Sequence, residues 1–390
     1  MNKLKKYLIT SALFLSSTLS MANTTPTEEY LTPHSTGPIA LVPHAPNIDA
    51  TGYVLMDEKS GKILASKNMH KKMQPASLTK LMTLFIASKE LAEGRIHLDD
   101  EVRVSQQAWK QGGSRMFLKA GSRVKVRDLI SGIIVASGND SCVALAEYIA
   151  GDEPTFANLM NQTAQQLGMK DSHFMNSTGL PNPEHYTTPY DLSILTQAII
   201  HDFPQYYAFY KQKWINHSNI KQPNRNRLLW RDPSVDGLKT GHTKEAGYCL
   251  ISSADRDDMR LISIVMGTPT DNDRSQFSEA LLNWGYRFYK THLLFHKDES
   301  VATQRVWGAK NRNLAFGFDH DVYVTVPAGS YDKLNAKAQF NEKLTAPIAK
   351  GSVHGNLNVT LNGKKILSLP LQALADDPKG GFWTSLTDHI

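Results

Sequence analysis

Cysteine is scarce in this sequence, which has 390 residues and only two cysteines, Cys142 and Cys249. Two cysteines cannot form a disulfide framework, and neither lies in a CxxC motif or beside histidines at zinc-ligand spacing. We therefore expect no structural metal, and no motif indicates a cofactor. In an exported protein the two cysteines could form a single bridge, but buried free thiols are the simpler interpretation.

Long apolar runs are also missing. Residues 1–22 combine three lysines with an apolar stretch from Tyr7 to about Leu19 and a small-residue site at 20–22, which is the pattern of a secretory signal peptide. Its apolar stretch is too short to span a bilayer comfortably, and no run of about 20 apolar residues occurs elsewhere. We therefore expect an exported protein that is soluble or only peripherally attached to a membrane.

A strong charge of one sign is absent as well. The chain has 43 basic and 37 acidic residues, and removal of the three signal lysines lowers its formal net charge from +6 to +3. Such a surplus does not indicate nucleic acid or a strongly anionic membrane, and no nucleic-acid partner is expected. The length and the apolar fraction of 41% fit two domains with full cores.

The first part of the mature chain predicts a mixed domain. Residues 23–46 are rich in Thr and Pro and form an extended leader. The domain over 47–291 then has strand patterns near both of its ends. Most of its helical patterns lie between those strands, and one more helix follows the last strand. The expected elements are a strand, turn and strand over 53–65, a buried helix over 78–91, a helix, turn and helix over 128–150, a hairpin over 248–266, and a helix to Phe288 capped at Asn272/Asp273. This order favours an α+β fold with one antiparallel sheet.

Beyond about residue 292 the pattern becomes purely β. Apolar residues alternate over 322–326 and 357–361, and Asn362-Gly363 suits a type I′ hairpin turn. We predict a separate small all-β domain over 296–374, a spacer or scaffold without a second active site. The tail over 375–390 is expected to be a weak membrane anchor or to pack on that domain, because its apolar face at 382–390 carries no lysine or arginine.

Three short motifs carry possible chemistry, and the first is Pro75-Ala76-Ser77-Leu78-Thr79-Lys80. Ser77 opens the predicted buried helix, and Lys80 follows at i+3 on the same helix face, so the amine can reach the hydroxyl. A lysine can activate a serine if burial or positive charge lowers its pKa. Alone, the motif is more typical of a capped helix with a surface lysine.

The second motif is Ser137-Gly138-Asn139, on the turn between two apolar helices. Such a turn can aim a hydroxyl and an amide at one point. Ser137 could relay a proton to a leaving group, and Asn139 could orient Lys80 or a substrate amide. Taken alone, the tripeptide is an ordinary loop.

The third motif is Lys239-Thr240-Gly241, followed by His242, on or beside an edge strand. Gly241 would let a ligand backbone approach closely, and an edge strand can pair with a peptide. Lys239 and Thr240 offer a positive charge and a hydroxyl to a carboxylate. The alternative is a solvated lysine that protects the edge from aggregation.

The order and spacing of the three motifs are more specific than any one of them. The set resembles that of the penicillin-recognising serine acyl-transferases. Over about residues 45–375 the chain is similar to the type-5 low-molecular-mass penicillin-binding proteins, the D-alanyl-D-alanine carboxypeptidases of the peptidase S11 kind. The similarity rests on QPASLTKLMT at 74–83, ASGND at 136–140, NRN at 224–226 and DGLKTGHT at 236–243.

The resemblance implies a transpeptidase domain of the penicillin-binding-protein and β-lactamase kind, an antiparallel sheet with a helical cluster, followed by the small all-β domain. It implies a catalytic group of Ser77, Lys80, Ser137, Asn139 and Lys239. It further implies substrate-binding residues Thr240, Gly241, His242 and Arg225, the last because guanidinium pairs well with carboxylate.

The resemblance also implies an activity and a location. Ser77 would be acylated by the D-Ala-D-Ala end of peptidoglycan stem pentapeptides, with an oxyanion hole of backbone amides from Ser77 and His242, and D-alanine would be released. β-Lactam antibiotics would be covalent inhibitors. The location would be the periplasm, with peripheral contact to the outer face of the inner membrane.

Three alternatives remain beside the carboxypeptidase. A class A β-lactamase would carry Glu-x-x-Asn, but Glu147, Glu153 and Glu184, the glutamates between the second and third motifs, all lack the Asn. A DD-endopeptidase acting on peptidoglycan crosslinks would use the same motifs. An inert wall-binding scaffold would have no chemical need for an activated serine, which argues against it.

Overall fold

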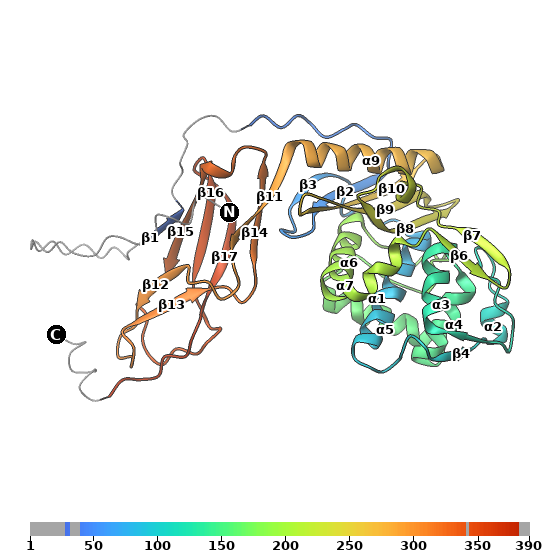
Figure 1. Cartoon of the computed structure of the whole chain (residues 1–390), viewed down its shortest axis with the longest axis horizontal. Helices are drawn as coiled ribbons and strands as arrows, with labels where there is room; N and C mark the ends of the chain where they lie inside the picture. The colour runs from blue at the N-terminus through green and yellow to red at the C-terminus, as the bar shows by residue number, and fades with distance from the viewer. Residues whose placement is uncertain (1–27, 32–39, 341–342, 382–390) are drawn as a thin grey trace, which may run out of the picture. The chain divides into compact units, whose positions relative to one another are not determined.

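The computed structural model describes residues 28–31, 40–340 and 343–381. Its chain divides into two compact units, each of which is discontinuous in sequence (Figure 1). The larger unit comprises residues 35–296 and 321–332. The second, which we call the β unit, comprises residues 1–34, 297–320 and 333–390.

The larger unit is built on a five-stranded antiparallel sheet in the order β3-β2-β10-β9-β8. Its strands are β2 (Gly52–Asp57), β3 (Ile63–Lys67), β8 (Val235–Thr243), β9 (Gly247–Arg256) and β10 (Met259–Thr268). Leu55 pairs with Ser263, which joins the two ends of the domain in one sheet. The predicted strand pair and hairpin are thus confirmed, and β8 lies at the sheet edge as expected.

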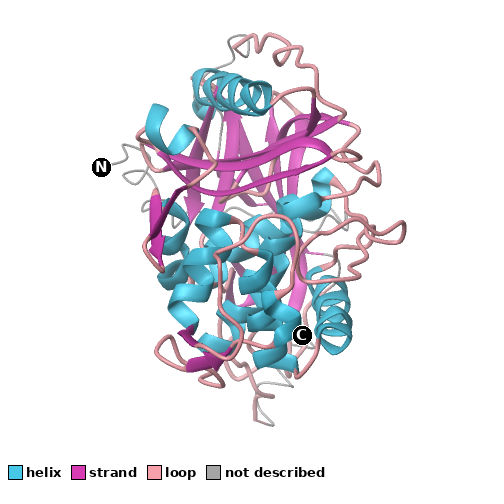
Figure 2. Ribbon diagram, turned by 90° about the vertical axis from the view of Figure 1, so that its right-hand side faces the viewer, coloured by secondary structure: helices cyan, strands magenta, loops and turns pink. Residues whose placement is uncertain are grey.

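Both faces of this sheet are covered. Along β2 the buried residues alternate, since Tyr53 and Leu55 pack with helix α9 (Asp271–Phe288) and Val54 and Met56 pack with the helical cluster. Figure 2 shows strands of this sheet between helices. The alternation of two apolar faces explains why the central strands read as nearly continuous apolar runs.

The helical cluster carries the first two sequence motifs. It comprises the 3-10 turn η2 (Ala76–Thr79), α1 (Lys80–Ala92), α3 (Val126–Ser131), the π-helix η3 (Gly132–Ala136), α4 (Asn139–Ala150), α5 (Glu153–Leu167) and α6 (Pro189–Asp202). The predicted buried helix and the predicted helix, turn and helix are confirmed. The π-helical segment before the turn was not expected from the sequence pattern.

Short elements complete the larger unit: α2 (Gln106–Trp109), α7 (Pro204–Tyr207), η4 (Ala208–Lys211), α8 (Leu228–Arg231), the pair β4 (Glu101–Arg103) and β5 (Arg123–Lys125), and the hairpin β6 (Trp214–His217) and β7 (Ile220–Pro223). Cys142 and Cys249 are both buried and free, so they form no bridge. Among the described residues, no helix combines the length and apolar character needed to cross a membrane.

The predicted cap of α9 is wrong by two or three residues. Thr270 is the N-cap, and its side chain accepts a hydrogen bond from the amide of Asp273 at 3.1 Å. Asn272 and Asp273 therefore lie inside the first turn. A threonine at this position competes successfully with the two following candidates because its hydroxyl reaches the amide at the third helical position.

The β unit contains a six-stranded sheet in the order β1-β15-β16-β17-β13-β12. Its strands are β1 (Glu28–Leu31), β12 (Ala302–Arg305), β13 (Asn313–Gly317), β15 (Leu334–Phe340), β16 (Val353–Leu361) and β17 (Lys364–Ala373). Asn362 and Gly363 both have positive φ, 48° and 77°, as the predicted type I′ turn requires. Strand β1 lies in the segment that we expected to be only an extended leader.

Strand β14 (Val322–Pro327) differs from expectation in its partner. The sequence places it in the small β domain over 296–374, but it pairs with β11 (Tyr289–Phe295) in the larger unit. There the Thr325 hydroxyl lies 2.6 Å from that of Ser60 and 2.9 Å from that of Thr291. An alternating pattern predicts a strand but not its neighbour, so the sequence could not show this pairing. The short 3-10 turn η5 (Tyr331–Lys333) follows.

Two predicted features, the signal segment over 1–22 and the apolar face at 382–390, lie outside the described residues.

Candidate active site

Ser77 lies on the 3-10 turn η2, directly before α1. Its neighbours Ala76 and Leu78 are buried, whereas Ser77 itself is half-buried. Ala76 has a φ of 48°, in the left-handed region that residues other than glycine rarely adopt. Because buried neighbours fix this unusual backbone, the Ser77 hydroxyl is held in place on an accessible turn.

Lys80, the first residue of α1, is fully buried and its amine contacts Ser77. Its Nζ lies 3.0 Å from Ser77 Oγ, 2.7 Å from Asn139 Oδ1 and 2.6 Å from the Thr178 carbonyl oxygen. A neutral amine has two N–H donors and one lone pair. With both donors satisfied by Asn139 and Thr178, the lone pair is left to accept the Ser77 proton.

The charge state of Lys80 favours this role. The pKa of Lys80 is lowered to about 8, mainly by burial; the positive charge of Arg225 acts in the same direction, and Cys142 and Asp140 act against it. A substantial fraction of this amine is therefore neutral near physiological pH, whereas an exposed lysine is almost entirely protonated there.

A second lysine and serine form a pair beside the first. Ser137 follows the π-helix η3 with a φ of 57°, and Lys239 on β8 is buried. Lys239 Nζ donates to Ser137 Oγ at 2.9 Å and to the Thr240 carbonyl at 2.9 Å. Burial, and after it the charge of Lys80, holds the pKa of Lys239 well below its usual value. A bound carboxylate would counter that shift, because it stabilises the ammonium form.

The loop between α2 and β5 fixes the orientation of Asn139. Asn139 Nδ2 donates to the Gly112 carbonyl and its backbone amide to the Ser114 carbonyl, both at 2.7 Å. The neighbouring Asp140 accepts from the amide of Met116 at 2.9 Å. With its Nδ2 bound to this loop, the Asn139 side chain must present its oxygen to the amine in the site.

Gly241 on β8 lies against the turn that carries Ser77. A Cβ at this position would lie 3.0 Å from the Pro75 carbonyl oxygen and 3.3 Å from the Leu78 amide nitrogen. The space that a side chain would need is thus occupied by the turn η2 that carries Ser77. The absence of a side chain lets β8 pack directly against the segment that carries Ser77.

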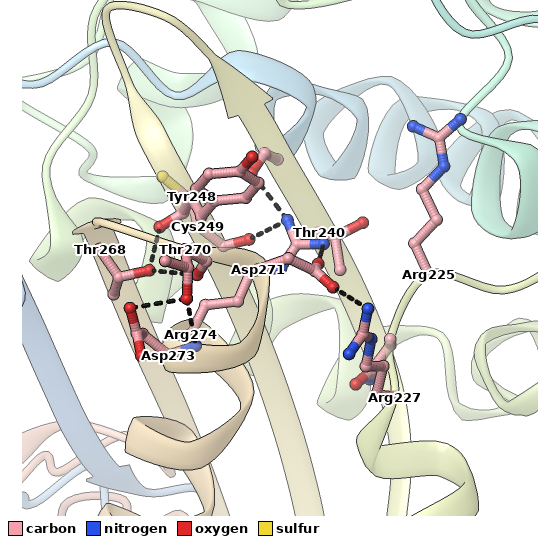
Figure 3. Close-up of polar contacts among 12 residues, drawn as sticks. Arg225, Arg227, Thr240, Tyr248, Cys249, Thr268, Thr270, Asp271, Asp273 and Arg274 are labelled. Atoms are coloured by element: carbon pink, nitrogen blue, oxygen red, sulfur yellow. Dashed lines mark hydrogen bonds and ion pairs between the residues drawn. The ribbon is translucent and has the colours of Figure 1, made fainter.

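The remaining predicted substrate-binding residues surround this strand. Thr240 is buried, and His242 is exposed and stacks on Tyr248 with ring centroids 4.0 Å apart. Arg225 donates to the Ser114 hydroxyl at 2.8 Å, and its charge lowers the pKa of the nearby buried lysines. In Figure 3 no contact joins Arg225 to the ion pairs drawn below it.

Those ion pairs involve a buried arginine that the sequence analysis missed. Arg274 of α9 is 4% exposed and donates to the Gly241 carbonyl at 3.1 Å. Arg274 forms an ion pair with Asp271, which also binds Arg227 at 2.6 Å (Figure 3). The Arg274 guanidinium also lies over the Tyr248 ring. Arginines in a first helical turn are usually solvated, so no sequence signal distinguishes this one. It ties α9 to the end of β8 that follows Lys239-Thr240.

The Thr178 carbonyl is a second missed contributor. It belongs to the turn Asn176-Ser177-Thr178-Gly179, in which Asn176 Oδ1 accepts from the Gly179 amide at 2.8 Å. A cluster of such residues is a turn signal in the sequence. The signal predicts the turn but does not tell that one of its carbonyls reaches Lys80.

Comparison with known proteins fits this geometry. A family model described as D-alanyl-D-alanine carboxypeptidase matches residues 39–270. The chain belongs to this family. A second model, the C-terminal domain of penicillin-binding protein 5, matches residues 289–379. As a member of the D-alanyl-D-alanine carboxypeptidase family, the protein is a hydrolase of the peptidase class, and the predicted family and fold are confirmed.

Individual relatives in the family extend over most of the chain. The carboxypeptidase DacC of Escherichia coli K12 is 43% identical over 354 residues, which are 89% of this chain and 88% of the relative. DacF of Bacillus subtilis is 34% identical over 87% of this chain and 88% of its own. The crystal structure of penicillin-binding protein 5 from Haemophilus influenzae superposes with a TM-score of 0.84 at 40% identity, covering 87% of this chain and 100% of that one.

Proposed function

We propose that this carboxypeptidase uses Ser77 as nucleophile and Lys80 as proton acceptor to release the C-terminal D-alanine of peptidoglycan stem peptides. One observation carries the assignment. The Lys80 amine is buried, contacts the Ser77 hydroxyl at 3.0 Å and has a pKa lowered to about 8. A serine that is half-buried beside a neutral amine is an activated nucleophile, whereas an isolated serine is not.

Acylation follows from the contacts. Ser77 Oγ attacks the carbonyl of the D-Ala-D-Ala peptide bond while its proton passes to Lys80 Nζ. Asn139 and Thr178 hold that nitrogen in line. The leaving amine takes a proton from the Ser137 hydroxyl, which Lys239 contacts at 2.9 Å, and the proton that Lys80 received is passed on to Ser137, so that both residues return to their starting protonation state. Water then hydrolyses the acyl-enzyme and frees Ser77 for another cycle.

The substrate's terminal carboxylate has a positively charged site available. Lys239, Arg225 and the Thr240 hydroxyl come from two segments that meet near Ser137, and His242 follows on the same strand. Guanidinium and ammonium groups discriminate in favour of a carboxylate, which a free C-terminus has and an internal peptide bond lacks. We therefore assign these residues to recognition of the chain end.

β-Lactams are proposed as covalent inhibitors of the same serine. A related structure, penicillin-binding protein D2 of Listeria monocytogenes, is in the ampicillin-bound form. It superposes on 63% of this chain with a TM-score of 0.58 at 28% identity. Since this sequence lacks the Glu-x-x-Asn motif between the second and third motifs, we expect the adduct to be long-lived.

The first test is direct. Incubation of the enzyme with a blocked tripeptide ending in Lys-D-Ala-D-Ala should release free D-alanine, and penicillin should add one adduct that peptide mass mapping places on Ser77. A crosslinked muropeptide dimer serves as the comparison substrate. Cleavage of the dimer without D-alanine release from the tripeptide would favour an endopeptidase. If neither substrate were cleaved, the protein would be an inert scaffold.

The pH dependence of kcat/KM tests the role of Lys80. Only the neutral amine can accept a proton, so activity should rise with pH through the Lys80 pKa of about 8 and fall about tenfold per pH unit well below it. The measurement is kcat/KM on the tripeptide from pH 6 to 10. A flat profile, with chemistry limiting, would contradict the assignment of Lys80 as the base.

Location is a further part of the proposal. The signal pattern of residues 1–22 supports export to the periplasm, where peptidoglycan stem peptides lie. Peripheral contact with the inner membrane is proposed from the family resemblance alone.

A further inference from the structure

We propose that Glu153 is a positioning residue for Lys80: its carboxylate holds the turn whose Thr178 carbonyl orients the amine, and its negative charge favours the protonated amine. The inference rests on the proposed role of Lys80 as the base. Glu153 belongs to none of the three sequence motifs, and its side chain touches neither Ser77 nor Lys80.

The position of Glu153 on α5 leaves its carboxylate available. Asp152 is the N-cap and accepts from the Thr155 amide at 2.7 Å, so it satisfies the helix start. Glu153, the first helical residue, is half-buried, and its side chain binds Ser177. An acidic residue in a first turn is commonly solvated and interacts only with the helix dipole. Here both carboxylate oxygens are used, one by the Ser177 hydroxyl and the other by its amide at 3.5 Å.

The turn that Glu153 binds leads directly to the base. Ser177 is fully buried, and its carbonyl accepts from the Thr83 hydroxyl at 2.7 Å. The next residue, Thr178, presents its carbonyl to Lys80 Nζ at 2.6 Å. One peptide unit therefore separates the residue that the carboxylate holds from the carbonyl that orients the amine. Loss of the Glu153 contact would loosen that acceptor without removing any group that reacts.

Charge gives a second, independent link. The charged or titratable groups coupled to Lys80 are Cys142 and Asp140 from α4, Glu153 from α5, His185 from the segment before α6, Arg225 from the segment before α8 and Lys239 from β8. Glu153 raises the pKa of Lys80, and Lys80 in turn lowers that of Glu153, although burial raises the Glu153 pKa more. Asp140 accepts from the backbone amides of Met116 and Leu118 in the 112–118 loop, so its replacement would disturb Asn139. Within the described part of the chain, Glu153 has no contact with that loop, so its charge can be changed without disturbing Asn139.

Two variants separate charge from positioning. Glu153→Gln keeps the length and an acceptor for the Ser177 hydroxyl but removes the charge. The acid limb, the part of the pH profile in which kcat/KM rises with pH, should therefore move to lower pH by about half a pH unit. Glu153→Asp keeps the charge but is too short to hold Ser177, so the limb should stay while kcat falls by about tenfold. Ser177→Ala breaks the same contact from the other side and should also lower kcat without moving the limb.

Glu184→Gln is the matched control. Glu184 is exposed and lies between the 176–179 turn and α6, so its replacement removes a charge from the same connection without touching Ser177. Its profile should coincide with that of the wild type. Thermal unfolding of every variant shows that the fold is intact.

The outcomes are distinct. An acid limb of Glu153→Gln that coincides with those of wild type and Glu184→Gln would overturn the charge effect. Wild-type kcat in both Glu153→Asp and Ser177→Ala would overturn the positioning role. The pH profile of the wild type is measured first. If its kcat/KM does not rise with pH, Lys80 is not the base, and this inference is overturned with that assignment.

Discussion

Replacement of Ser77 by alanine is expected to abolish D-alanine release and covalent labelling by penicillin, a loss of at least about 10⁴-fold in kcat/KM. The physical reason is that no other hydroxyl can take its place as nucleophile. Lys80 Nζ contacts one hydroxyl, that of Ser77, among the described residues, and the nearby Ser137 hydroxyl is bound to Lys239. D-Alanine release and penicillin labelling of the variant measure the loss.

The fold should tolerate this change. Lys80 keeps its contacts with Asn139 and Thr178. The replacement removes only one hydroxyl group, and Ser77 is half-buried, so no cavity forms in the core. Ser193→Ala is the control, because it removes a buried hydroxyl that donates to the Tyr190 carbonyl at 2.6 Å, outside the site. This control should retain wild-type activity. Persistent penicillin labelling of Ser77→Ala would place the nucleophile elsewhere.

Replacement of Gly179 by alanine is expected to cost about 3 kcal/mol or more of folding free energy and about 100-fold in kcat/KM. Gly179 has a φ of 81°, and a Cβ there would lie 1.8 Å from the Ala76 carbonyl oxygen. That oxygen belongs to the backbone of the nucleophile turn, so no side-chain rotation relieves the clash. Either the 176–179 turn or the segment before Ser77 must move, and both movements disturb the contacts of Lys80.

Gly168→Ala separates backbone strain from this clash. Gly168 ends α5 with a φ of 79°, nearly the same as that of Gly179, but a Cβ there would meet nothing within 4 Å. Its replacement should cost only the left-handed conformation, about 1–2 kcal/mol, and leave kcat/KM unchanged. Chemical denaturation and tripeptide kinetics of both variants make the comparison. Equal effects of the two replacements would contradict the close packing of Gly179 on the nucleophile turn.

The part of the site that the sequence predicts is the part set by local spacing and by residue type. Ser77 and Lys80 share a helix face because they are three residues apart, and the structure brings their side chains into contact. Asn139 and Lys239 come from distant segments; the turn pattern suggested only that Asn139 could orient Lys80, and the family resemblance joined both residues to that pair. The structure then shows Asn139 on Lys80 and Lys239 on Ser137, as two adjacent pairs.

The part that could not be predicted consists of backbone acceptors and non-local charges. A carbonyl such as that of Thr178 has no residue-type signature, since every residue has one. Arg274 and Glu153 look like ordinary first-turn residues of their helices, because nothing in their local sequence tells that tertiary packing buries Arg274 and half-buries Glu153. In the fold, the same reasoning applies to β14, whose partner β11 is set by long-range contacts.

The discontinuity of the two units has a consequence for how the protein can be divided. Three separate segments make up the β unit, and the chain passes between the units at four points, near residues 34, 296, 320 and 332. A truncated chain ending at residue 296 would keep β11 but lose β14, and with it the Thr325 hydroxyl that contacts Ser60. Its β11 would have an unpaired edge able to template association with other chains. Exchange of the β unit between relatives therefore requires four junctions, so it is not a cassette that a single cut can release.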